Sequence, residues 1–451
     1  MYEYPPNAFW QVTAHKLVTH WKHLPLLIKY TYNGKGSAFC VQRKEDKMFK
    51  KFVSVFLCII TVFTFTSAAF IRSGGITAEA ASSFTLPYYY YQMGDEAQEF
   101  YSYIRKAVKE CRSKIKLNIE FDDEELLMIL ELLILHDPMT FNLDDIDVLD
   151  ETRNSMTLGF TYKYDKETYD KMVKEYDKAT NKILSKFTDG MSTYNKIKTI
   201  HDEIINNAVY DLDASDNDNI YGALVSNKAK CDGYAKTFSY VCGKAGIRTV
   251  TVIGNDLTTD SKDNGHMWNK VYYNKKWYNV DVTWDDPISN MKDSLQYDYF
   301  MVSDKALKNT HEEDNLSFEV PKADDDTRGY YVVNKKYAES NQDAEKLIKS
   351  GLKTVVQSGE KSFSFKFASK DIMNYVNDYL KDGEKMYRVF KDVINSTSKK
   401  PAGMYYWAFD ENLLTVRVYI FYEDTKLEDY FIDPDSVDSD DLEDLAEYGI
   451  T

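Results

Sequence analysis

The stretch NKAKCDGYAKTF, residues Asn227–Phe238, places a single cysteine at the point where a helical pattern begins. From Cys231 the apolar residues recur at helical intervals as far as Lys244. At the N-terminus of a helix, unsatisfied N–H groups and the helix dipole favour the thiolate, which is the nucleophilic form of cysteine. Gly233 leaves room for another segment of chain to approach the first turn. The pattern therefore predicts that Cys231 is a nucleophile at a helix start.

The composition is that of a folded and acidic protein with more than one domain. The 451 residues are 43% hydrophobic and carry a formal net charge of −16. We therefore expect two or three domains and no nucleic-acid partner, which would need a basic surface. Acidic residues are concentrated at 433–451, but an EF-hand calcium loop starting at Asp433 fails, because Val437 and Asp438 stand at its fifth and sixth places. We interpret this segment as a solvated tail and expect no metal and no cofactor.

An export signal is the clearest feature near the start of the chain. Two lysines precede the apolar run 52–70, and an A-x-A cleavage motif follows, ending at Ala80. We therefore predict a signal peptide at 48–80, a true start at Met48, and an upstream extension at 1–47 that is not part of the fold. The apolar run is also close to the minimum length of a membrane-spanning helix, so an uncleaved anchor stays open.

Cysteine usage leaves at least one thiol unpaired. Cleavage near Ala80 leaves three cysteines, Cys111, Cys231 and Cys242, which is an odd number. Cys231 and Cys242 are eleven positions apart on the predicted helix. That separation is about 16 Å in rise, and it forbids a disulfide or a shared zinc ion between them. The unpaired thiol is therefore either buried and inert or functional.

A catalytic thiol needs a histidine as proton acceptor and a carboxylate or amide to orient that histidine. The mature chain has four histidines. We interpret His136 as a helix-end residue, His201 as a packed residue of an amphipathic helix, and His311 as a solvated residue of a polar loop. His266 differs, because it opens a predicted hairpin strand after Gly265. We therefore predict that His266 is the base.

The hairpin places one carboxylate beside His266. A two-residue turn at 274–275 sets the register in which His266 and Asp281 are diagonal neighbours on one face, about 6–8 Å apart at Cβ. Asn279 lies on the same face but farther from His266, so Asp281 is the preferred orienting group and Asn279 the alternative. The opposite face suits a core and holds Met267, Val271, Val280, Val282 and Trp284. We expect the polar face to be turned toward the cysteine helix.

Each of the three candidate residues has an ordinary structural explanation when it is taken alone. Cys231 fits a buried small residue, His266 a polar residue at a strand end, and Asp281 a turn or cap acceptor. Their combination is less ordinary, because a helix-start thiol and a histidine facing a carboxylate are the parts of a nucleophilic site.

Three separated blocks carry a family resemblance. They are KIKTIHDEIINNAVYD (196–211), IYGALVSNKAKCDGYAKTFSYVCGKAGI (220–247) and GHMWNKVYYNKKWYNVDVTWDDP (265–287). In order and spacing they resemble the bacterial secreted transglutaminase-like (transglutaminase/protease-like) domain. The resemblance covers about residues 191–303. It implies an α+β, papain-like fold in which a nucleophile helix packs on an antiparallel sheet.

The same resemblance implies a Cys-His-Asp triad and acyl transfer on amides. Matched residue by residue, Cys231 is the nucleophile, His266 the base and Asp281 the orienting carboxylate. The thiolate attacks a peptide bond or a glutamine carboxamide, and water or an amine resolves the acyl-enzyme. Family oxyanion holes add an upstream donor to the backbone N–H of the nucleophile, and Tyr210 and Tyr221 are the candidates here. The polar loop before His266 is expected to border the substrate cleft.

These assignments divide the chain into a catalytic domain between two small α/β domains. The expected segments are an upstream extension at 1–47, a signal peptide at 48–80, an N-terminal α/β domain at 81–190, a transglutaminase-like domain at 191–310, a C-terminal α/β domain at 311–432, and an acidic tail at 433–451. The two flanking domains share a loose order of strands and helices, with YYVV (330–333) expected as a strand. This order fits either an internal duplication or two independent modules.

The expected function is secreted or cell-surface acyl transfer by a protease, deamidase or cross-linking enzyme. The expected partner is a protein or peptide substrate, with cell-wall peptide as one candidate, and no membrane span remains after signal cleavage. The alternative is a non-catalytic cell-surface or cell-wall binding module on the same fold. The substrate and the oligomeric state cannot be predicted from the sequence.

Overall fold

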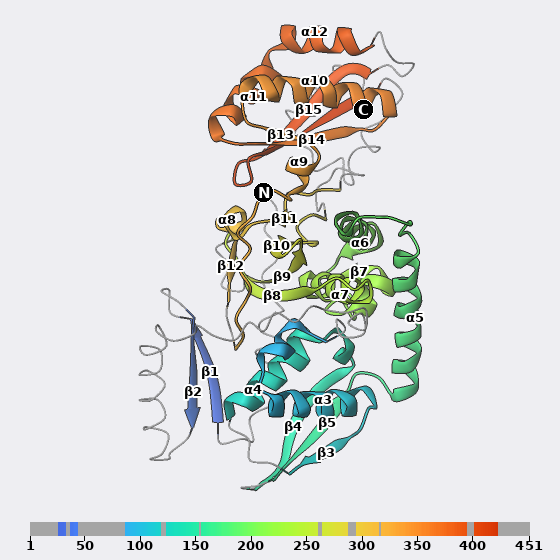
Figure 1. The fold of residues 1–451 in the computed structure, drawn as a ribbon, viewed down its shortest axis with the longest axis vertical. Helices are drawn as coiled ribbons and strands as arrows, with labels where there is room; N and C mark the ends of the chain where they lie inside the picture. Colours follow the sequence, from blue (N-terminus) through green and yellow to red (C-terminus); the bar gives the residue numbers. More distant parts are fainter. Residues whose placement is uncertain are drawn as a thin grey trace.

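The computed structural model describes residues 26–32, 37–43, 86–118, 123–152, 155–259, 264–286, 295–314, 317–394 and 401–422 (Figure 1). The predicted signal peptide at 48–80 and the acidic tail at 433–451 lie outside these residues, as does most of the predicted extension at 1–47. Within that extension, β1 (Leu26–Tyr32) and β2 (Ser37–Arg43) form an antiparallel pair. Among the described helices, none has the length and the apolar character that crossing a bilayer requires.

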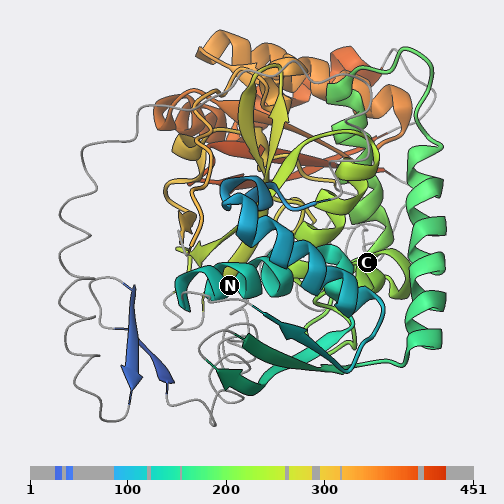
Figure 2. The same ribbon diagram turned by 60° about the horizontal axis from the view of Figure 1, so that its bottom comes forward.

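The N-terminal unit is a three-stranded antiparallel sheet with helices packed on it. Its elements are η3 (Tyr88–Gln92), α3 (Asp95–Lys109), β3 (Lys114–Leu117), α4 (Asp123–Glu131), η4 (Leu132–His136), η5 (Pro138–Thr140), β4 (Leu143–Thr152), β5 (Ser155–Tyr162) and α5 (Lys166–Leu184). The strand order is β3-β5-β4. The long helix α5 runs along one side of the molecule and contacts α6 and η6 of the central unit (Figure 2).

The central unit is built on a five-stranded sheet. Its elements are α6 (Thr193–Asn207), β6 (Val209–Tyr210), η6 (Gly222–Ser226), β7 (Lys228–Ala229), α7 (Cys231–Lys244), β8 (Thr249–Asp256), β9 (Gly265–Tyr273), β10 (Lys276–Val280), β11 (Phe300–Val302), α8 (Asp304–Leu307) and β12 (His311–Glu313). The strand order is β11-β10-β9-β8-β12, and every pairing is antiparallel. Helix α7 packs on β8 and β9. The predicted α+β arrangement, a cysteine helix on an antiparallel sheet, is confirmed.

The C-terminal unit has its own mixed sheet and largely its own core. Its elements are α9 (Tyr330–Val333), β13 (Tyr337–Ala338), α10 (Asn341–Ser358), β14 (Ser362–Phe367), α11 (Lys370–Lys381), α12 (Gly383–Ile394), β15 (Pro401–Asp410) and β16 (Thr415–Tyr422). The strand order is β13-β14-β16-β15. The strand predicted at YYVV is wrong: the segment is the short helix α9, in which Tyr331 is buried while Val332 and Val333 are exposed.

The two outer units share one topology. Apart from β13, which pairs with β14 and has no counterpart in the N-terminal unit, each has a helix, a strand, a helical segment and two further strands. Among these strands the first pairs with the third, which pairs with the second. This common order fits either an internal duplication or two independent modules. The units differ in attachment. The apolar core of the N-terminal unit continues into the central sheet through Val250, Val252 and Trp268, whereas the C-terminal core is formed almost wholly by residues 338–422.

Candidate active site

Cys231 is the first residue of α7, as the sequence predicts, and α7 ends at Lys244. Lys230 precedes the helix in extended conformation, and β6 and β7 pair just upstream. Cys231 is 5% exposed and packs with Ile253 and Met267 of the sheet and with Leu135 of the N-terminal unit. The described cysteines Cys111, Cys231 and Cys242 are all free. The thiol therefore sits at a helix start, almost covered by apolar side chains.

Gly233 is required by a close approach of the chain to the first turn of α7. A Cβ atom at this position would lie 2.3 Å from the carbonyl oxygen of Asn217. The same carbonyl accepts a hydrogen bond from the N–H of Lys230 at 2.9 Å. The approaching segment predicted from Gly233 is therefore the loop of 211–219, and it fixes the backbone on which Cys231 is presented.

The hairpin of β9 and β10 has the predicted register. Asn274 and Lys275 form its two-residue turn with φ of 49° and 67°, the positive values typical of a type I′ turn. Asn279 pairs with Lys270, and the ladder ends where Val280 pairs with Asn269. Asp281 is the next residue and begins a turn.

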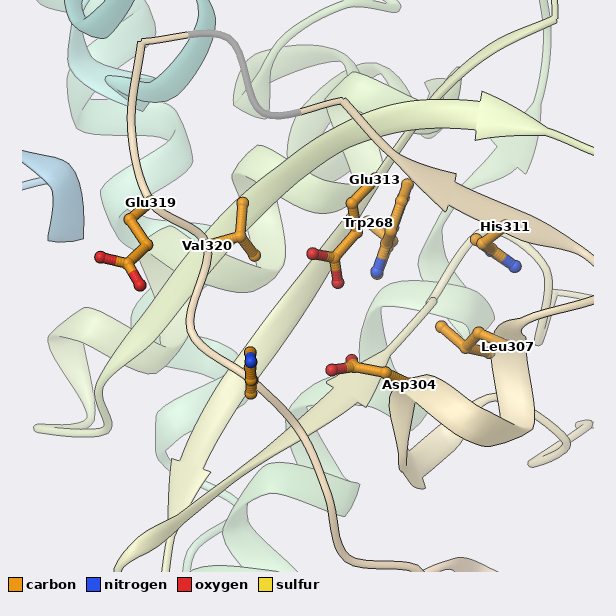
Figure 3. A pocket seen from close by; sticks show the side chains of 8 residues that line it. Trp268, Asp304, Leu307, His311, Glu313, Glu319 and Val320 are labelled. Atoms are coloured by element: carbon orange, nitrogen blue, oxygen red, sulfur yellow. The ribbon is translucent and has the colours of Figure 1, made fainter. Parts of the chain in front are cut away.

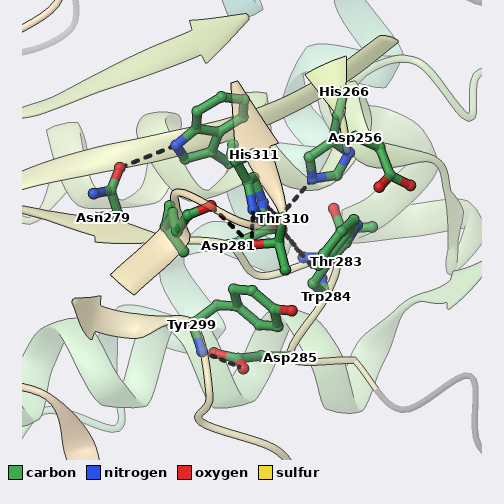
Figure 4. A network of polar contacts seen from close by, with 12 residues as sticks. Asp256, His266, Asn279, Asp281, Thr283, Trp284, Asp285, Tyr299, Thr310 and His311 are labelled. Atoms are coloured by element: carbon green, nitrogen blue, oxygen red, sulfur yellow. Dashed lines mark hydrogen bonds and ion pairs between the residues drawn. The ribbon is translucent and has the colours of Figure 1, made fainter. Parts of the chain in front are cut away.

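His266 and Asp281 meet at the end of this hairpin. The Nε2 atom of His266 lies 2.5 Å from Oδ2 of Asp281, and both residues are buried (Figure 4). The other ring nitrogen, Nδ1, is not used by Asp281, and Cys231 is close enough to raise the pKa of His266. The structure thus brings together all three residues selected from the sequence, in the order thiol, imidazole, carboxylate.

His311 completes the cluster, and its predicted place in a solvated loop is wrong. It begins β12, which pairs with β8, and it is 6% exposed. Its Nε2 lies 2.9 Å from Oδ2 of Asp281, and its Nδ1 lies 2.9 Å from the hydroxyl of Thr310 (Figure 4). The rings of Trp268 and Trp284 pack against it, with centroids 4.9 and 4.5 Å away. A three-residue strand in an acidic segment has no hydrophobic pattern, so no sequence signal could have revealed this position.

The sheet faces α7 differently from the prediction. Asn269 donates to the carbonyl of Ala235 and to the hydroxyl of Ser239, both on α7, and Met267 packs on Cys231. The helix therefore covers the face of Met267 and not the face of His266. The contact between thiol and imidazole is made at the start of β9 and the start of α7, where the two elements meet.

Trp284 also lies elsewhere than predicted. It was expected on the core face with Met267, but the chain turns after Val280, with the N–H of Asp285 donating to the carbonyl of Asp281. The turn places the Trp284 ring 5.3 Å from that of His266. The indole therefore forms part of the wall around His266 and Asp281.

Charge is distributed unequally over the cluster. Burial disfavours the ionised form of Asp281, but the charge of His266 and hydrogen bonds from both histidines hold the pKa of this carboxyl well below its usual range. Burial likewise opposes a charge on His266, yet Asp281 and Cys231 raise its pKa. Burial lowers the pKa of His311 despite its bond to Asp281. At neutral pH the arrangement is an ionised Asp281, a protonated His266 and a neutral His311.

The cluster is spaced closely enough to be considered for a metal ion. One ligand atom each from His266, Asp281 and His311 lies within 4.8 Å of the others. Two ligands of one tetrahedral zinc ion would be about 3.3 Å apart, whereas the His266–Asp281 separation is 2.5 Å. Asp281 also accepts from the backbone N–H groups of Thr283 and Trp284 on its other oxygen. These distances are those of a hydrogen-bonded cluster.

The other histidines have structural contacts. His136 ends η4, as predicted, and its Nδ1 lies 2.6 Å from the Thr251 hydroxyl. His201 is packed in α6, as predicted, between Asp202 and Asp285, each 3.0 Å from a ring nitrogen.

The sequence also suggested an alternative orienting residue, two donors for an oxyanion hole and a loop beside the cleft. Asn279 accepts from Trp268 Nε1 at 3.0 Å and donates to Asp304 at 2.8 Å, so it does not orient His266. Of the two oxyanion candidates, Tyr221 donates to Glu175 at 2.8 Å, whereas Tyr210 pairs with Ala229, two residues before Cys231. In the polar loop expected beside the cleft, residues 260–263 lie outside the described residues.

A pocket of about 360 Å³ opens on the side of the sheet away from α7 (Figure 3). Its lining residues are Trp268, Asp304, Leu307, His311, Glu313, Glu319, Val320 and Lys322. Two of the lining residues pair with the buried Lys270, Asp304 at 2.8 Å and also Glu313. His311 therefore stands between this pocket and Asp281.

The central unit is similar to known proteins. Residues 181–282 match the family model of the Transglutaminase-like superfamily. The kyphoscoliosis peptidases of Mus musculus and Homo sapiens are 32% identical over 111 residues and 33% identical over 95 residues, covering 22% and 19% of this chain. The chain spans only 17% and 14% of those relatives. A TGase crystal structure is 16% identical with a TM-score of 0.23, covering 41% of this chain and 54% of that one.

Proposed function

We propose that the transglutaminase-like domain of this chain, with its α+β papain-like fold, catalyses cysteine-dependent acyl transfer on peptide or glutamine amides. The observation that carries the proposal is the buried His266–Asp281 hydrogen bond beside Cys231, whose proximity raises the pKa of His266. The thiol stands at a helix N-terminus, where free N–H groups favour its ionised form. An imidazole that is held protonated beside it stabilises the thiolate further.

The residues supply each step of such a reaction. The Cys231 thiolate attacks the amide carbonyl, and the oxyanion that forms is stabilised by the N–H of Cys231, which has no partner within α7. His266 gives its proton to the leaving amine or ammonia as the C–N bond breaks, which leaves a thioester. His266 then takes a proton from water or from an amine, which attacks the thioester and releases the thiol. Asp281 holds the imidazole in the required tautomer throughout.

The surroundings of the reaction are part of the proposal. We propose a protein or peptide substrate, with cell-wall peptide as one candidate, and a secreted or cell-surface location. This location is supported by the lysine-flanked apolar run and the A-x-A motif ending at Ala80. Cleavage after this motif would leave no membrane span. Whether water or an amine accepts the acyl group divides a protease or deamidase from a cross-linking enzyme.

Thiol labelling tests the nucleophile without knowledge of the substrate. We expect iodoacetamide at near-neutral pH to modify Cys231 at least about 10-fold faster than Cys111, with the sites mapped by peptide mass spectrometry. Burial raises the pKa of both Cys111 and Cys242, so these thiols are internal references. Equal rates at Cys231 and Cys111 would overturn the proposal.

Activity is then measured on a glutamine-containing casein. Incorporation of a biotinylated amine, ammonia release and peptide cleavage are followed in parallel, and Cys231→Ala should abolish whichever the wild type shows. Cys242→Ala is the matched control on the same helix, because it removes a thiol that is 0% exposed and lies eleven positions along α7 from Cys231.

A second function is favoured by one observation. Cys231 and His266 are each only 5% exposed, which suits a binding module whose catalytic cleft has been closed. In that case peptide or glycan binding would survive Cys231→Ala, and wild-type Cys231 would label no faster than the reference thiols.

A further inference from the structure

His311 makes a contact that the three-residue site does not use. Asp281 accepts four hydrogen bonds, two on each oxygen. Oδ1 accepts from the backbone N–H groups of Thr283 and Trp284 at 3.0 and 3.1 Å. Oδ2 accepts from His266 at 2.5 Å and from His311 at 2.9 Å. Among the described residues, His311 is thus the one side chain besides His266 whose hydrogen bond holds this carboxylate.

The neighbours of His311 fix which of its nitrogens carries the proton. Asp281 is ionised and can only accept, so Nε2 of His311 must be the donor. Burial lowers the pKa of His311, so the ring is neutral and Nδ1 must accept. The hydroxyl of Thr310 lies 2.9 Å from this Nδ1 and 3.0 Å from the carbonyl of Leu307, so the two acceptors share its single hydrogen. Thr310 therefore contacts the ring nitrogen of His311 that Asp281 does not use.

We propose that His311 is a positioning residue for the reaction: its Nε2–H group fixes the Asp281 carboxylate so that Oδ2 stays directed at His266. The inference rests on the proposed function. It follows from the sharing of one oxygen by two imidazoles, because a carboxylate anchored only by two backbone N–H groups on Oδ1 can rotate Oδ2 away from His266. The second imidazole removes that freedom, and the Trp268 and Trp284 rings hold it in place.

A matched pair of variants separates hydrogen bonding from packing. His311→Phe keeps a ring of similar size but has no donor, whereas His311→Gln keeps a donor on a smaller side chain. A hydrogen bond to a charged group accounts for about 10- to 100-fold in rate. We expect His311→Phe to slow the labelling of Cys231 by iodoacetamide by about that factor, and His311→Gln to recover most of the loss. If the Phe variant labels at the wild-type rate, or if both variants lose equally, the proposal is wrong.

The adjoining pocket offers a sharper test by chemical rescue. His311 lines the pocket of about 360 Å³, so His311→Ala would open a path from the pocket to Oδ2 of Asp281. Added imidazole can occupy the vacated volume and donate its N–H to the carboxylate. We expect it to raise Cys231 labelling several-fold in His311→Ala and to leave His311→Phe unchanged. 1-Methylimidazole is the control, because its neutral form has no N–H, and the measurement is made above the pKa of both compounds.

The outcomes distinguish this inference from the proposed function. If wild-type Cys231 labels no faster than Cys111, the proposed function fails first. If wild-type labelling is fast and 1-methylimidazole rescues His311→Ala as well as imidazole does, the volume of His311 matters and not its hydrogen bond, and this inference alone fails. Should His311→Ala not fold, as judged by urea unfolding, the Phe and Gln variants still decide the question.

Discussion

Two buried histidine–aspartate pairs lie only four residues apart on the turn that follows β10. Asp281 pairs with His266 at 2.5 Å, and Asp285 pairs with His201 at 3.0 Å. All four residues are buried. The pairs differ in the number of donors around each carboxylate. Asp281 accepts from two histidines and two backbone N–H groups, whereas Asp285 accepts from His201 and from the N–H of Tyr299.

The donors decide the state of each carboxylate. The pKa of Asp281 is lowered against the effect of burial, while burial, helped by the nearby Asp298, raises the pKa of Asp285 to about 6. Of the two histidines, only His266 has its pKa raised by a neighbouring thiol. His201 instead stacks on Tyr297, with centroids 5.5 Å apart. Burial and pairing alone therefore do not distinguish the two histidines: the nearby thiol and the four donors around Asp281 do, and they select His266 as the proposed base.

The largest expected effect is on reactivity when His266 is changed. His266→Gln removes the proton carrier beside Cys231, and general acid–base catalysis contributes about 10²- to 10⁴-fold. We expect the rate of Cys231 labelling and any amide activity to fall by that factor. The free energy of unfolding, measured in urea, should stay within about 1 kcal/mol of wild type, because glutamine still donates to Asp281. His201→Gln is the control and should leave the labelling rate of folded protein unchanged. If His266→Gln and His201→Gln lost labelling rate equally, the two histidine–aspartate pairs would not differ in their effect on Cys231.

Asp281→Asn should lower both reactivity and stability. Asparagine leaves the buried, charged His266 without its counter-charge, which costs about 3–5 kcal/mol. In His266→Gln the Asp281 carboxylate instead keeps three other donors. The direction in which the stability contributed by this pair changes with pH follows from two pKa shifts. The pKa of Asp281 is lowered on folding, so its contribution is present above about pH 4 and is lost as the pH falls further. The pKa of His266 is raised, so its contribution is lost only as the pH rises through that raised value.

Urea unfolding at a series of pH values measures this window. The difference in unfolding free energy between wild type and Asp281→Asn should be greatest between about pH 4 and pH 7 and shrink on either side. A difference that is the same at acidic, neutral and alkaline pH would mean that the pair is not ionised in the folded protein.

The sequence predicted the parts of the site that local rules determine. The bounds of α7 follow from helical periodicity, and the register of β9 and β10 follows from a two-residue turn at Asn274 and Lys275. Together they bring Cys231, His266 and Asp281 within reach of one another. The two-residue period of a strand also shows which residues share a face.

Long-range packing decided what the sequence did not predict. Strand periodicity does not say which neighbour each face meets, so the helix was expected on the wrong face of β9. His311 reaches Asp281 through the pairing of β12 with β8, two strands 55 residues apart at His311 and Asp256. Such a pairing leaves no local pattern in an acidic stretch of three residues. For the same reason β4 and β15, which depend on partner strands, were not anticipated.

His201→Gln should act on stability rather than on reactivity. The ring fills a site between Asp202, Asp285 and the ring of Phe300, whose centroid is 5.0 Å away. Loss of one of two buried hydrogen bonds and of ring packing lowers the free energy of unfolding by about 2–3 kcal/mol. Urea denaturation of wild type and His201→Gln at neutral pH measures this loss of unfolding free energy. A loss below that of His266→Gln would show that the structural role has been assigned to the wrong pair.

Asp285→Asn is expected to have the smallest effect, and its pH dependence should be opposite in sign to that of Asp281→Asn. Because folding raises the pKa of Asp285 to about 6, the folded protein binds this proton more tightly than the unfolded chain does, and wild-type stability falls as the pH rises from about 4 to about 6. Asparagine carries no such penalty and still accepts from the N–H of Tyr299. Because burial already disfavours the Asp285 charge, the variant should lie within about 1 kcal/mol of wild type at pH 7 and compare less favourably at pH 4. Parallel pH profiles for the two asparagine variants would show that the donors around Asp281 and Asp285 do not set their charge. Opposite profiles follow only if Asp281 stays ionised in acid while Asp285 is protonated up to about pH 6.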